Sequence, residues 1–346
     1  MSRLATEAPA KLNLALEVVG RRDDGFHELW TVFDAIDLCD RLDYEPGDGA
    51  PRLVLAGGDP ASGAPRLVLA GGDPASGAPE GDDNLVLRAA RTFAEATGLP
   101  SGGTWTLTKA VPAGAGLGGG SSDAAAALRL LCERHGRDPT APDVAALARG
   151  LGADVPFFLH GGRAWADGRG DRIHPLPGGP RFAYLLLHPG RPLATAAVFA
   201  RCAAGERGGF TDPPHDLSSP SDRSAEAAAE RSGREVAAGR DEAAARGLCA
   251  LLARTGEAGP WAEGLFNDLE RAAQGAAPWL DALRLELLRQ GFPRFHLSGS
   301  GSTLFVAATD PRPLAELGQR LGPALARPPL ADLAPGAVLL PAHSRA

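Results

Sequence analysis

The sequence predicts a two-domain protein in which α-helices and β-strands are mixed. Its 346 residues leave room for two domains at the usual length of roughly 100–200 residues each. Residues 12–19 alternate in polarity and end in β-branched side chains, which is typical of a strand, and residues 104–111 form a second such segment. Residues 85–96 and the alanine-rich residues 122–135 have the pattern of helices that end at glycine.

The composition favours a soluble, cytoplasmic protein. No apolar run approaches the roughly 18 residues that span a bilayer, and residues 1–10 lack the cationic and apolar regions of a signal peptide. A net charge of −7 argues against nucleic acid or an anionic membrane as a partner. Four cysteines without a CxxC pair are expected to be reduced, mostly buried thiols: Cys39, Cys132, Cys202 and Cys249.

Capping and turn residues predict the limits of further elements. Asn84 is expected to cap the helix at 85–96, and Thr140 to cap a helix over 142–149. Additional segments of helical pattern are 248–252 and 279–289, and additional segments of strand pattern are 295–298 and 303–307.

Two regions do not fit a regular domain. Residues 51–64 are repeated without change at 65–78, which we interpret as a duplication without function in a surface hairpin, each copy offering the short strand RLVL and a turn. Residues 202–246 are rich in Ala, Gly, Ser and Pro and have almost no aliphatic side chains. This composition predicts a disordered or partly helical insertion that buries no core.

Lysine is scarce in this chain. Among 35 basic residues only Lys11 and Lys109 are lysines. An ammonium group and a planar guanidinium differ in geometry, so the two lysines mark positions where arginine would not serve.

A glycine-rich run, PAGAGLGGGSSD at 112–123, separates the strand at 104–111 from the helix at 122–135. The absence of Cβ atoms lets backbone N–H groups approach an anion closely. Ser121 or Ser122 is expected to cap the following helix, whose N-terminus adds partial positive charge. The sequence therefore predicts a phosphate-binding loop.

Other kinds of glycine loop fit less well. Gly114-x-Gly116-x-x-Gly119 satisfies the dinucleotide fingerprint, but that fold also needs an acidic residue at a strand end about 20 residues on. Glu133 lies instead within a helical stretch, and Gly120 occupies the place of the lysine in a Walker A loop. A plain flexible linker is rarely set between a clear strand and a clear helix.

The run PAGAGLGGGSSDAAAAL resembles the phosphate-binding motif of the galactose, homoserine and mevalonate (GHMP) kinases. Its triple glycine followed by Ser-Ser-Asp is typical of the diphosphocytidyl-methylerythritol kinase branch, in which a basic residue usually occupies the position of Lys109. PAKLNL at 9–14 with GRRDDGFHEL at 20–29 resembles that branch, as do LGADVPFF at 151–158 and LSGSGSTLF at 297–305. FNDLE at 266–270 also matches and is interpreted as structural. The resemblance covers about 1–45, 84–200 and 264–308.

The resemblance implies a two-domain α+β GHMP kinase fold with the active site between the domains. The expected N-terminal domain, 1–175, is similar to domain 2 of ribosomal protein S5. The expected C-terminal domain, 176–346, is ferredoxin-like and contains the insertion at 202–246. The oligomeric state stays open between monomer and homodimer.

The implied reaction is in-line transfer of the γ-phosphoryl group of ATP, with Mg²⁺, to the 2-hydroxyl of 4-diphosphocytidyl-2-C-methyl-D-erythritol in the non-mevalonate isoprenoid pathway. The resemblance implies that Asp154 is the general base and that Lys11 pairs with it. From the sequence, Asp154 is expected between a helix end and an apolar strand. The loop residues implied for ATP are Pro112, Ala113, Gly114, Ala115, Gly116, Leu117, Gly118, Gly119, Gly120, Ser121 and Ser122.

Five further residues are implied in substrate binding. Phe26 and His27 match a Tyr-His pair that holds the cytosine, although Phe26 lacks the usual hydroxyl. Thr195 and Phe199 match a segment whose aromatic ring completes the cytosine sandwich, and Asn13 is expected near Asp154. The alternatives are another GHMP kinase acting on homoserine, mevalonate or a sugar, an NAD-binding oxidoreductase, and an inactive family member that serves as a binding protein.

Overall fold

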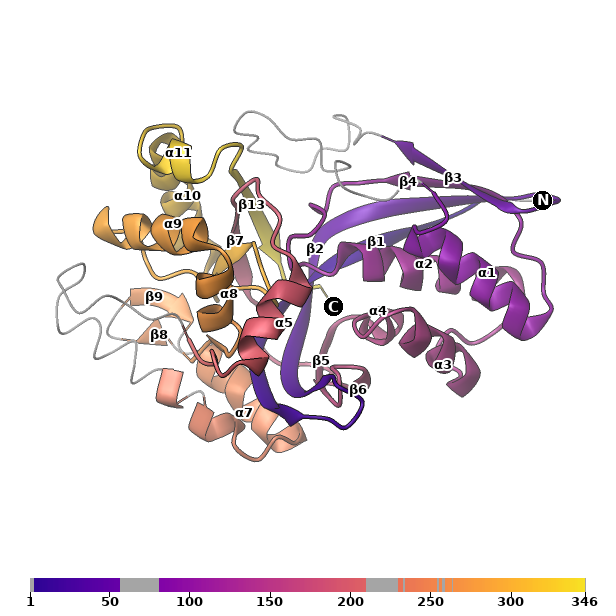
Figure 1. The fold of residues 1–346 in the computed structure, drawn as a ribbon, viewed down its shortest axis with the longest axis horizontal. Helices are drawn as coiled ribbons and strands as arrows, with labels where there is room; N and C mark the ends of the chain where they lie inside the picture. The colour runs from indigo at the N-terminus through magenta and orange to yellow at the C-terminus, as the bar shows by residue number, and fades with distance from the viewer. Residues whose placement is uncertain are drawn as a thin grey trace.

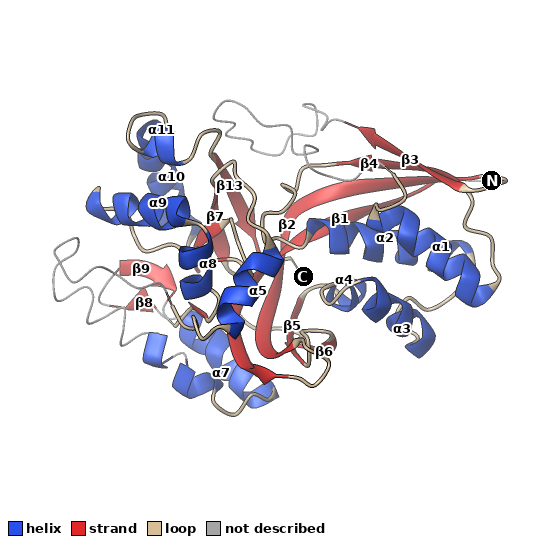
Figure 2. Cartoon of the chain, viewed as in Figure 1, coloured by secondary structure: helices blue, strands red, loops and turns tan. Residues whose placement is uncertain are grey.

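The computed structural model describes residues 3–56, 81–209, 230–232, 234–253, 255–256, 259–262 and 264–345. Two sheets organise these residues, and the long strands β1 (Leu4–Arg21) and β2 (His27–Pro46) run through the centre of the molecule (Figure 1). Helices from the N-terminal half gather beside the first sheet, and those near the C-terminus gather beside the second (Figure 2). The mixture of helices and mainly antiparallel strands agrees with the expected α+β class.

The first sheet carries the N-terminal strands. Its order among the described residues is β10-β1-β2-β4-β3, while β5 pairs with β2 and β6 with β5. The pairing of β1 with β2 runs from Leu4↔Tyr44 to Arg21↔His27, so the strand predicted at 12–19 extends further at both ends. This mainly antiparallel sheet differs from the parallel sheet of a dinucleotide-binding fold. Its other strands are β3 (Pro51–Ala56), β4 (Gly103–Thr108), β5 (Arg163–Asp167), β6 (Arg172–Pro175) and β10 (Phe266–Asn267).

The second sheet is antiparallel and has the order β11-β12-β7-β13. Along the chain, one strand of this sheet and the helices after it precede two strands, two further helices and a last strand, which is the pattern of a ferredoxin-like domain. The strands are β7 (Ala183–His188), β11 (His296–Leu297), β12 (Leu304–Ala308) and β13 (Val338–His343), and β8 (Thr255–Gly256) pairs separately with β9 (Gly259–Ala262).

The chain passes from the first sheet to the second between β6 and β7, near the expected domain boundary. However, β10 comes from the C-terminal half and pairs with β1 in the first sheet, through Ala15↔Phe266 and Leu16↔Asn267. The division at residue 175 therefore stays a prediction.

The helices follow the expected order, and none of those described is long and apolar enough to cross a membrane. Asn84 caps the first of them by accepting the N–H of Val86 at 2.9 Å, as predicted. The helices are α1 (Leu85–Thr97), α2 (Gly119–Arg134), α3 (Pro142–Leu151), α4 (Val155–His160), α5 (Thr195–Ala203), α7 (Glu242–Leu252), α8 (Glu270–Ala276), α9 (Pro278–Arg289), α10 (Pro311–Leu325) and α11 (Leu330–Leu333).

Two predicted helix caps are wrong. Helix α2 begins at Gly119, within the glycine run, and its N-cap residue is Gly118, so neither serine caps it. The N-cap residue of α3 is Ala141, because both the N–H and the hydroxyl of Thr140 donate to Asp138 instead.

The prediction of an apolar strand after Asp154 is also wrong, because this segment forms helix α4. Pro156 lies in the first turn of α4, where proline favours helix initiation. Phe157 and Phe158 are buried in the core beside the alanines of α2. A short apolar run does not distinguish a buried helix from a buried strand.

The two irregular regions are only partly described. Residues 51–56 of the first copy form β3, a strand at the end of the first sheet with Val54 exposed, whereas residues 57–64 and the copy at 65–78 lie outside the described residues. Of 202–246, residues 210–229 and 233 also lie outside them. The described remainder is partly helical, as expected, but Ala237, Ala244 and Ala245 are buried in a core cluster. The prediction that this stretch buries no core is wrong there, since small alanine side chains are sufficient to pack against the sheet.

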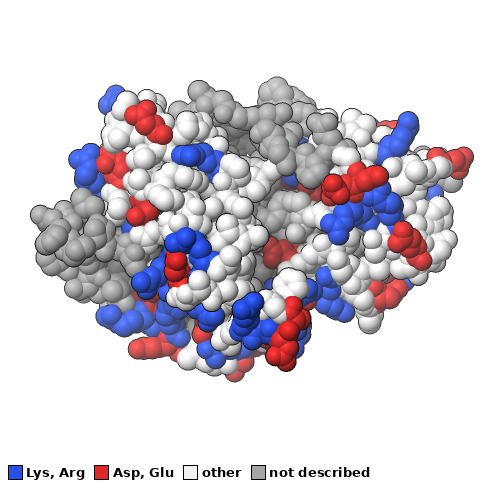
Figure 3. All heavy atoms as spheres, viewed as in Figure 1, with Lys and Arg blue, Asp and Glu red and all other residues white. Residues whose placement is uncertain are grey.

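Charged side chains of both signs are interspersed on the face of the molecule shown in Figure 3. One carboxylate, Glu270 at the start of α8, is instead buried. It accepts the N–H of Leu297 at 3.0 Å and lies 3.4 Å from Nδ1 of His296 and 3.5 Å from Arg294. Burial opposes the ionisation of Glu270, but His296, Arg294 and the Leu297 N–H outweigh it and lower its pKa to about 2.

We expect Glu270→Gln to destabilise the protein in a pH-dependent way. A folded-state pKa below the unfolded one gives stability that is present above about pH 4.5 and is lost as the pH falls toward 2. The free energy of unfolding in urea should therefore differ between wild type and variant by on the order of 3 kcal/mol at pH 7 and by less than half of that at pH 3. The exposed Glu95→Gln is the control. An equal difference at both pH values would contradict the prediction.

Candidate active site

A cavity of about 520 Å³ lies where the two sheets meet. Residues 112–121 of the glycine-rich run line one side of it, and Lys11 and Asn13 of β1 line its floor. Thr195 and Phe199 line it from α5, and Asp154 lines it from the position before α4. The cavity therefore brings together predicted residues that are up to 188 positions apart in the sequence (Lys11 to Phe199).

The first glycine loop, residues 112–120, ends at the N-terminus of α2. Gly116 and Gly118 have φ values of +76° and +72°, which favour glycine. A Cβ on Gly116 would lie 2.2 Å from the carbonyl oxygen of Ser298, so a side chain cannot fit there. The first N–H groups of α2 have no intrahelical acceptors and carry partial positive charge. This arrangement fits the phosphate groups of a nucleotide.

Lys11, like Lys109, is a buried cation that lines the cavity, and it is 4% exposed. Its Nζ donates to Asn13 Oδ1 at 2.6 Å and to the carbonyl oxygen of Gly116 at 3.0 Å. The same Nζ lies 3.6 Å from Asp154 Oδ2, so the expected ion pair is present. Burial lowers the pKa of Lys11, and Asp154 partly offsets that effect.

Asp154 retains a carboxylate that is available to a ligand. It occupies the N-cap position of α4, but its side chain makes no capping hydrogen bond. Its side chain is 31% exposed, in contrast to that of Lys11. One carboxylate oxygen faces the ammonium group of Lys11, so an acceptor for a substrate proton lies in the cavity wall.

Asn13 links this pair to the strands beneath it. Its Nδ2 donates to the hydroxyl of Thr31 at 2.8 Å, and that hydroxyl donates to the carbonyl oxygen of Ala15 at 2.6 Å. With Oδ1 bonded to Lys11, the side chain of Asn13 has a fixed orientation between β1 and β2.

The residues expected at the cytosine end are only partly brought together. The ring centroids of His27 and Phe199 are 5.3 Å apart, and Thr195 bonds to the hydroxyl of Ser300 at 2.8 Å. Burial lowers the pKa of His27, and nearby Arg207 and Arg21 lower it further, which favours the neutral imidazole. Neither His27 nor Phe26 lines the cavity, and Phe26 is also 55% exposed.

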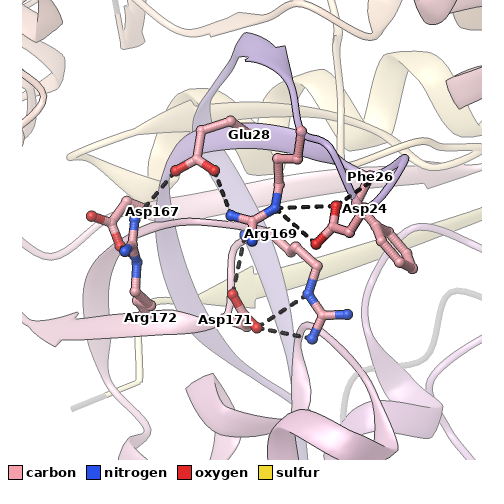
Figure 4. A network of polar contacts seen from close by, with 8 residues as sticks. Asp24, Phe26, Glu28, Asp167, Arg169, Asp171 and Arg172 are labelled. Carbon is pink, nitrogen blue, oxygen red and sulfur yellow. Dashed lines mark hydrogen bonds and ion pairs between the residues drawn. The ribbon is translucent and has the colours of Figure 1, made fainter.

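Phe26 belongs to a polar network at the tip of the β1–β2 hairpin (Figure 4). Arg169, in the turn between β5 and β6, lies with its guanidinium carbon 5.0 Å from the centroid of the Phe26 ring. Asp171 accepts from Arg169 at 3.0 Å and holds it in place. Arg169 also lines the cavity, and nothing in the sequence pattern singled it out.

Lys109 lies beneath the first glycine loop between two buried carboxylates. It donates to Asp40 and, at 2.8 Å, to Asp123 of α2. Asp40 also accepts the N–H groups of Ala110 and Val111, at 2.6 and 2.8 Å, where the chain enters the loop. Lysine scarcity marked Lys109, and Asp123 belongs to the Ser-Ser-Asp of the glycine-rich run, whereas Asp40, 69 residues from Lys109, had no sequence signal.

Ser122 differs from the other predicted loop residues. It is fully buried in α2 and is absent from the cavity lining, whereas Ser121 lines the cavity. The second glycine loop, residues 298–303, packs on the first: Ser298 Oγ donates to the carbonyl oxygen of Gly116 at 3.0 Å, and Thr303 N donates to that of Ala115 at 3.1 Å.

Known proteins resemble this chain in sequence and in fold. The family model described as the GHMP kinases N terminal domain matches residues 84–162. A relative from Chromohalobacter salexigens, named 4-diphosphocytidyl-2-C-methyl-D-erythritol kinase, is 42% identical over 200 residues, which are 58% of this chain and 60% of that protein. The chain thus spans about three fifths of the length of that curated relative. A relative of the same name from Heliobacterium modesticaldum is 35% identical over 297 residues, which are 86% of this chain and 84% of that protein.

Solved structures extend the comparison. A crystal structure of 4-(cytidine 5'-diphospho)-2C-methyl-D-erythritol kinase has 30% identity and a TM-score of 0.63, covering 99% of this chain and 100% of that one. Homoserine kinase from Cytophaga hutchinsonii, at 17% identity and a TM-score of 0.58, covers 100% of this chain and 95% of that one and shares the fold alone. The chain therefore belongs to the 4-diphosphocytidyl-2-C-methyl-D-erythritol kinase family of GHMP kinases.

Proposed function

We propose that this protein phosphorylates the 2-hydroxyl of 4-diphosphocytidyl-2-C-methyl-D-erythritol with ATP, producing the 2-phosphate and ADP. The observation that carries this proposal is the buried Lys11, 3.6 Å from Asp154, in a cavity bordered by the first glycine loop. A phosphate-binding loop, a cation and a carboxylate base within one cavity are the parts that phosphoryl transfer to an alcohol requires. The unpaired cysteines Cys39, Cys132, Cys202 and Cys249 fit a cytoplasmic reaction.

The first glycine loop and the start of α2 would hold the phosphates of ATP. Gly119, Gly120 and Ser121 line the cavity in the first turn of α2, where backbone N–H groups and a hydroxyl would contact the phosphates. No group of three or more His, Cys, Asp or Glu side chains suited to a metal occurs in the described part of the chain. Mg²⁺ typically keeps waters and binds phosphate oxygens with few protein ligands, so Ser121 with the nucleotide is a suitable site. When bound, Mg²⁺ would neutralise charge on the phosphates.

Asp154 would accept the proton of the attacking hydroxyl. Its Oδ2 lies 3.6 Å from Lys11 Nζ, so the ion pair holds the carboxylate at the wall of the cavity. Lys11 would also stabilise negative charge on the transferred phosphoryl group, because its ammonium lies beside the carbonyl oxygen of Gly116 in the phosphate loop. Asn13 would orient both the amine and the substrate hydroxyl, since its amide is fixed by Lys11 and Thr31.

The cytosine would bind at His27 and Phe199. A neutral imidazole has one donor and one acceptor, which suits the edge of a cytosine ring, and the phenyl ring of Phe199 offers a stacking surface. Thr195 would contribute to this end of the cavity through its position beside Ser300. Phe26 would reach the base only if its ring moved from its place on Arg169.

We expect Asp154→Asn to lower kcat by about 10²–10⁴-fold, the usual contribution of a general base. The affinity for ATP should change little, because the phosphate loop is intact. Release of ADP should be measured with the cytidyl substrate, homoserine, mevalonate and galactose in parallel. Asp332→Asn, at an exposed site on α11, is the control. Turnover of another alcohol by the wild type would contradict the proposed substrate, and full activity of Asp154→Asn would contradict the proposed base.

We expect Phe199→Ala to raise the KM for the cytidyl substrate by about 10-fold or more, since stacking on a base contributes about 1–3 kcal/mol. The KM for ATP should stay near that of the wild type. Phe26→Ala should have a smaller effect, because that ring lies outside the cavity lining. Steady-state kinetics with each substrate varied would test this, and equal effects of the two variants would show that the Phe26 ring closes on the substrate.

A further inference from the structure

Asn267 is a buried amide at the junction of the two sheets. It is 1% exposed and lies on β10, where it pairs with Leu16 of β1. Its Nδ2 donates to the carbonyl oxygens of Leu297 and Gly299, both at 2.8 Å. Its Oδ1 accepts the N–H of Leu269 at 2.9 Å. Both amide protons therefore hold the second glycine loop and the residue before it.

The loop that Asn267 holds lies directly against Lys11 in the cavity. A Cβ built on Gly299 would be 3.0 Å from Lys11 Nζ and 3.3 Å from Asn13 Oδ1. The carbonyl oxygen of Gly116 accepts both Ser298 Oγ and Lys11 Nζ, each at 3.0 Å. The position of the second glycine loop therefore limits the position of the Lys11 ammonium.

The hydroxyl groups of Ser298, Ser300 and Ser302 bond to Gly116, Thr195 and Arg191, which lie in the first glycine loop, in α5 and before α5. Gly299 and Gly301 have φ values of +55° and +90°, and glycine loses more conformational freedom on ordering than other residues. Hydrogen bonds within the loop, from Ser298 N to Thr303 O and from Gly301 N to Ser298 O, define its turn but do not attach it to β1. Asn267 provides that attachment, because β10 pairs with the strand that carries Lys11.

We propose that Asn267 is a positioning residue for phosphoryl transfer: by holding the carbonyl groups of Leu297 and Gly299, it sets the second glycine loop against Lys11 and so places the ammonium group between Asp154 and the phosphate loop. The proposal rests on the proposed function for the reaction that it serves. Asn267 touches neither the cavity nor the reacting atoms. Its effect is on the geometry of transfer and not on substrate affinity.

The first test is Asn267→Asp, which keeps the shape of the side chain and the acceptor for Leu269. It replaces both donors by a carboxylate oxygen that faces two carbonyl oxygens. We expect kcat to fall by about 100-fold, as for a misplacement of about 1 Å, and the KM values for ATP and the alcohol to change by less than about threefold. Leu283→Ala, at a buried position of α9 that does not line the cavity, should lose stability without this fall in kcat.

A second test avoids added charge. Asn267→Ser replaces the amide, with its two donor hydrogens, by the shorter neutral side chain of serine. If the second glycine loop withdraws, water reaches Lys11, and its pKa, which burial holds down, rises. The alkaline limb of the pH profile of kcat should then move to higher pH. Leu283→Ala should leave that limb in place, because a general loss of stability does not change the surroundings of Lys11.

Hydrogen exchange tests the positioning role of Asn267 without any substrate. The amides of Ser298, Gly301 and Thr303 are hydrogen-bonded in the wild type and should exchange at least about tenfold faster in folded Asn267→Ser. If the wild type acts on a different alcohol but this exchange rises, the proposed substrate fails and the positioning role stands. Unchanged exchange together with kcat within twofold of wild type, in either folded Asn267 variant, would overturn the proposal.

Discussion

The close contact between the two glycine loops is the constraint on which the site depends. A Cβ on Gly116 would lie 2.2 Å from the carbonyl oxygen of Ser298 and 2.8 Å from that of Gly301, so the backbones meet with no room for a side chain. The first loop follows β4 of the first sheet, and the second joins β11 to β12 of the second sheet. Their contact closes the cavity over Lys11, and a loose fit would separate the phosphate-binding loop from the ammonium group.

The burial of Lys11 is a consequence of that contact. An ammonium group removed from water is costly unless it is paired and hydrogen-bonded. Asn13, the carbonyl of Gly116 and Asp154 supply the partners, and the three come from β1, the first glycine loop and the start of α4. Because Asp154 stays partly exposed, the pair leaves a carboxylate oxygen within reach of a substrate, which a fully enclosed ion pair would not.

Hydrogen-bonded backbone links join the halves of the chain. β10 brings residues 266–267 to β1, and Asn267 extends that pairing to the second glycine loop through two carbonyl groups. Glu270 secures the same region by accepting the N–H of Leu297. The segment FNDLE was interpreted from the sequence as structural, and its contacts show that its structure and the geometry of the site cannot be separated.

The sequence by itself determined the parts of this protein that are local: the glycine loop before α2, the Asn84 cap, and the lysine and aspartate in motifs that resemble one kinase family. Only the tertiary structure decided which of them meet. It placed His27 beside Phe199 but left Phe26 on Arg169, began α2 at Gly119, and made a helix of 155–160. It also put Asp40 and Asp123 around Lys109. Local patterns report backbone preference, whereas these contacts depend on packing between segments that are distant in the chain.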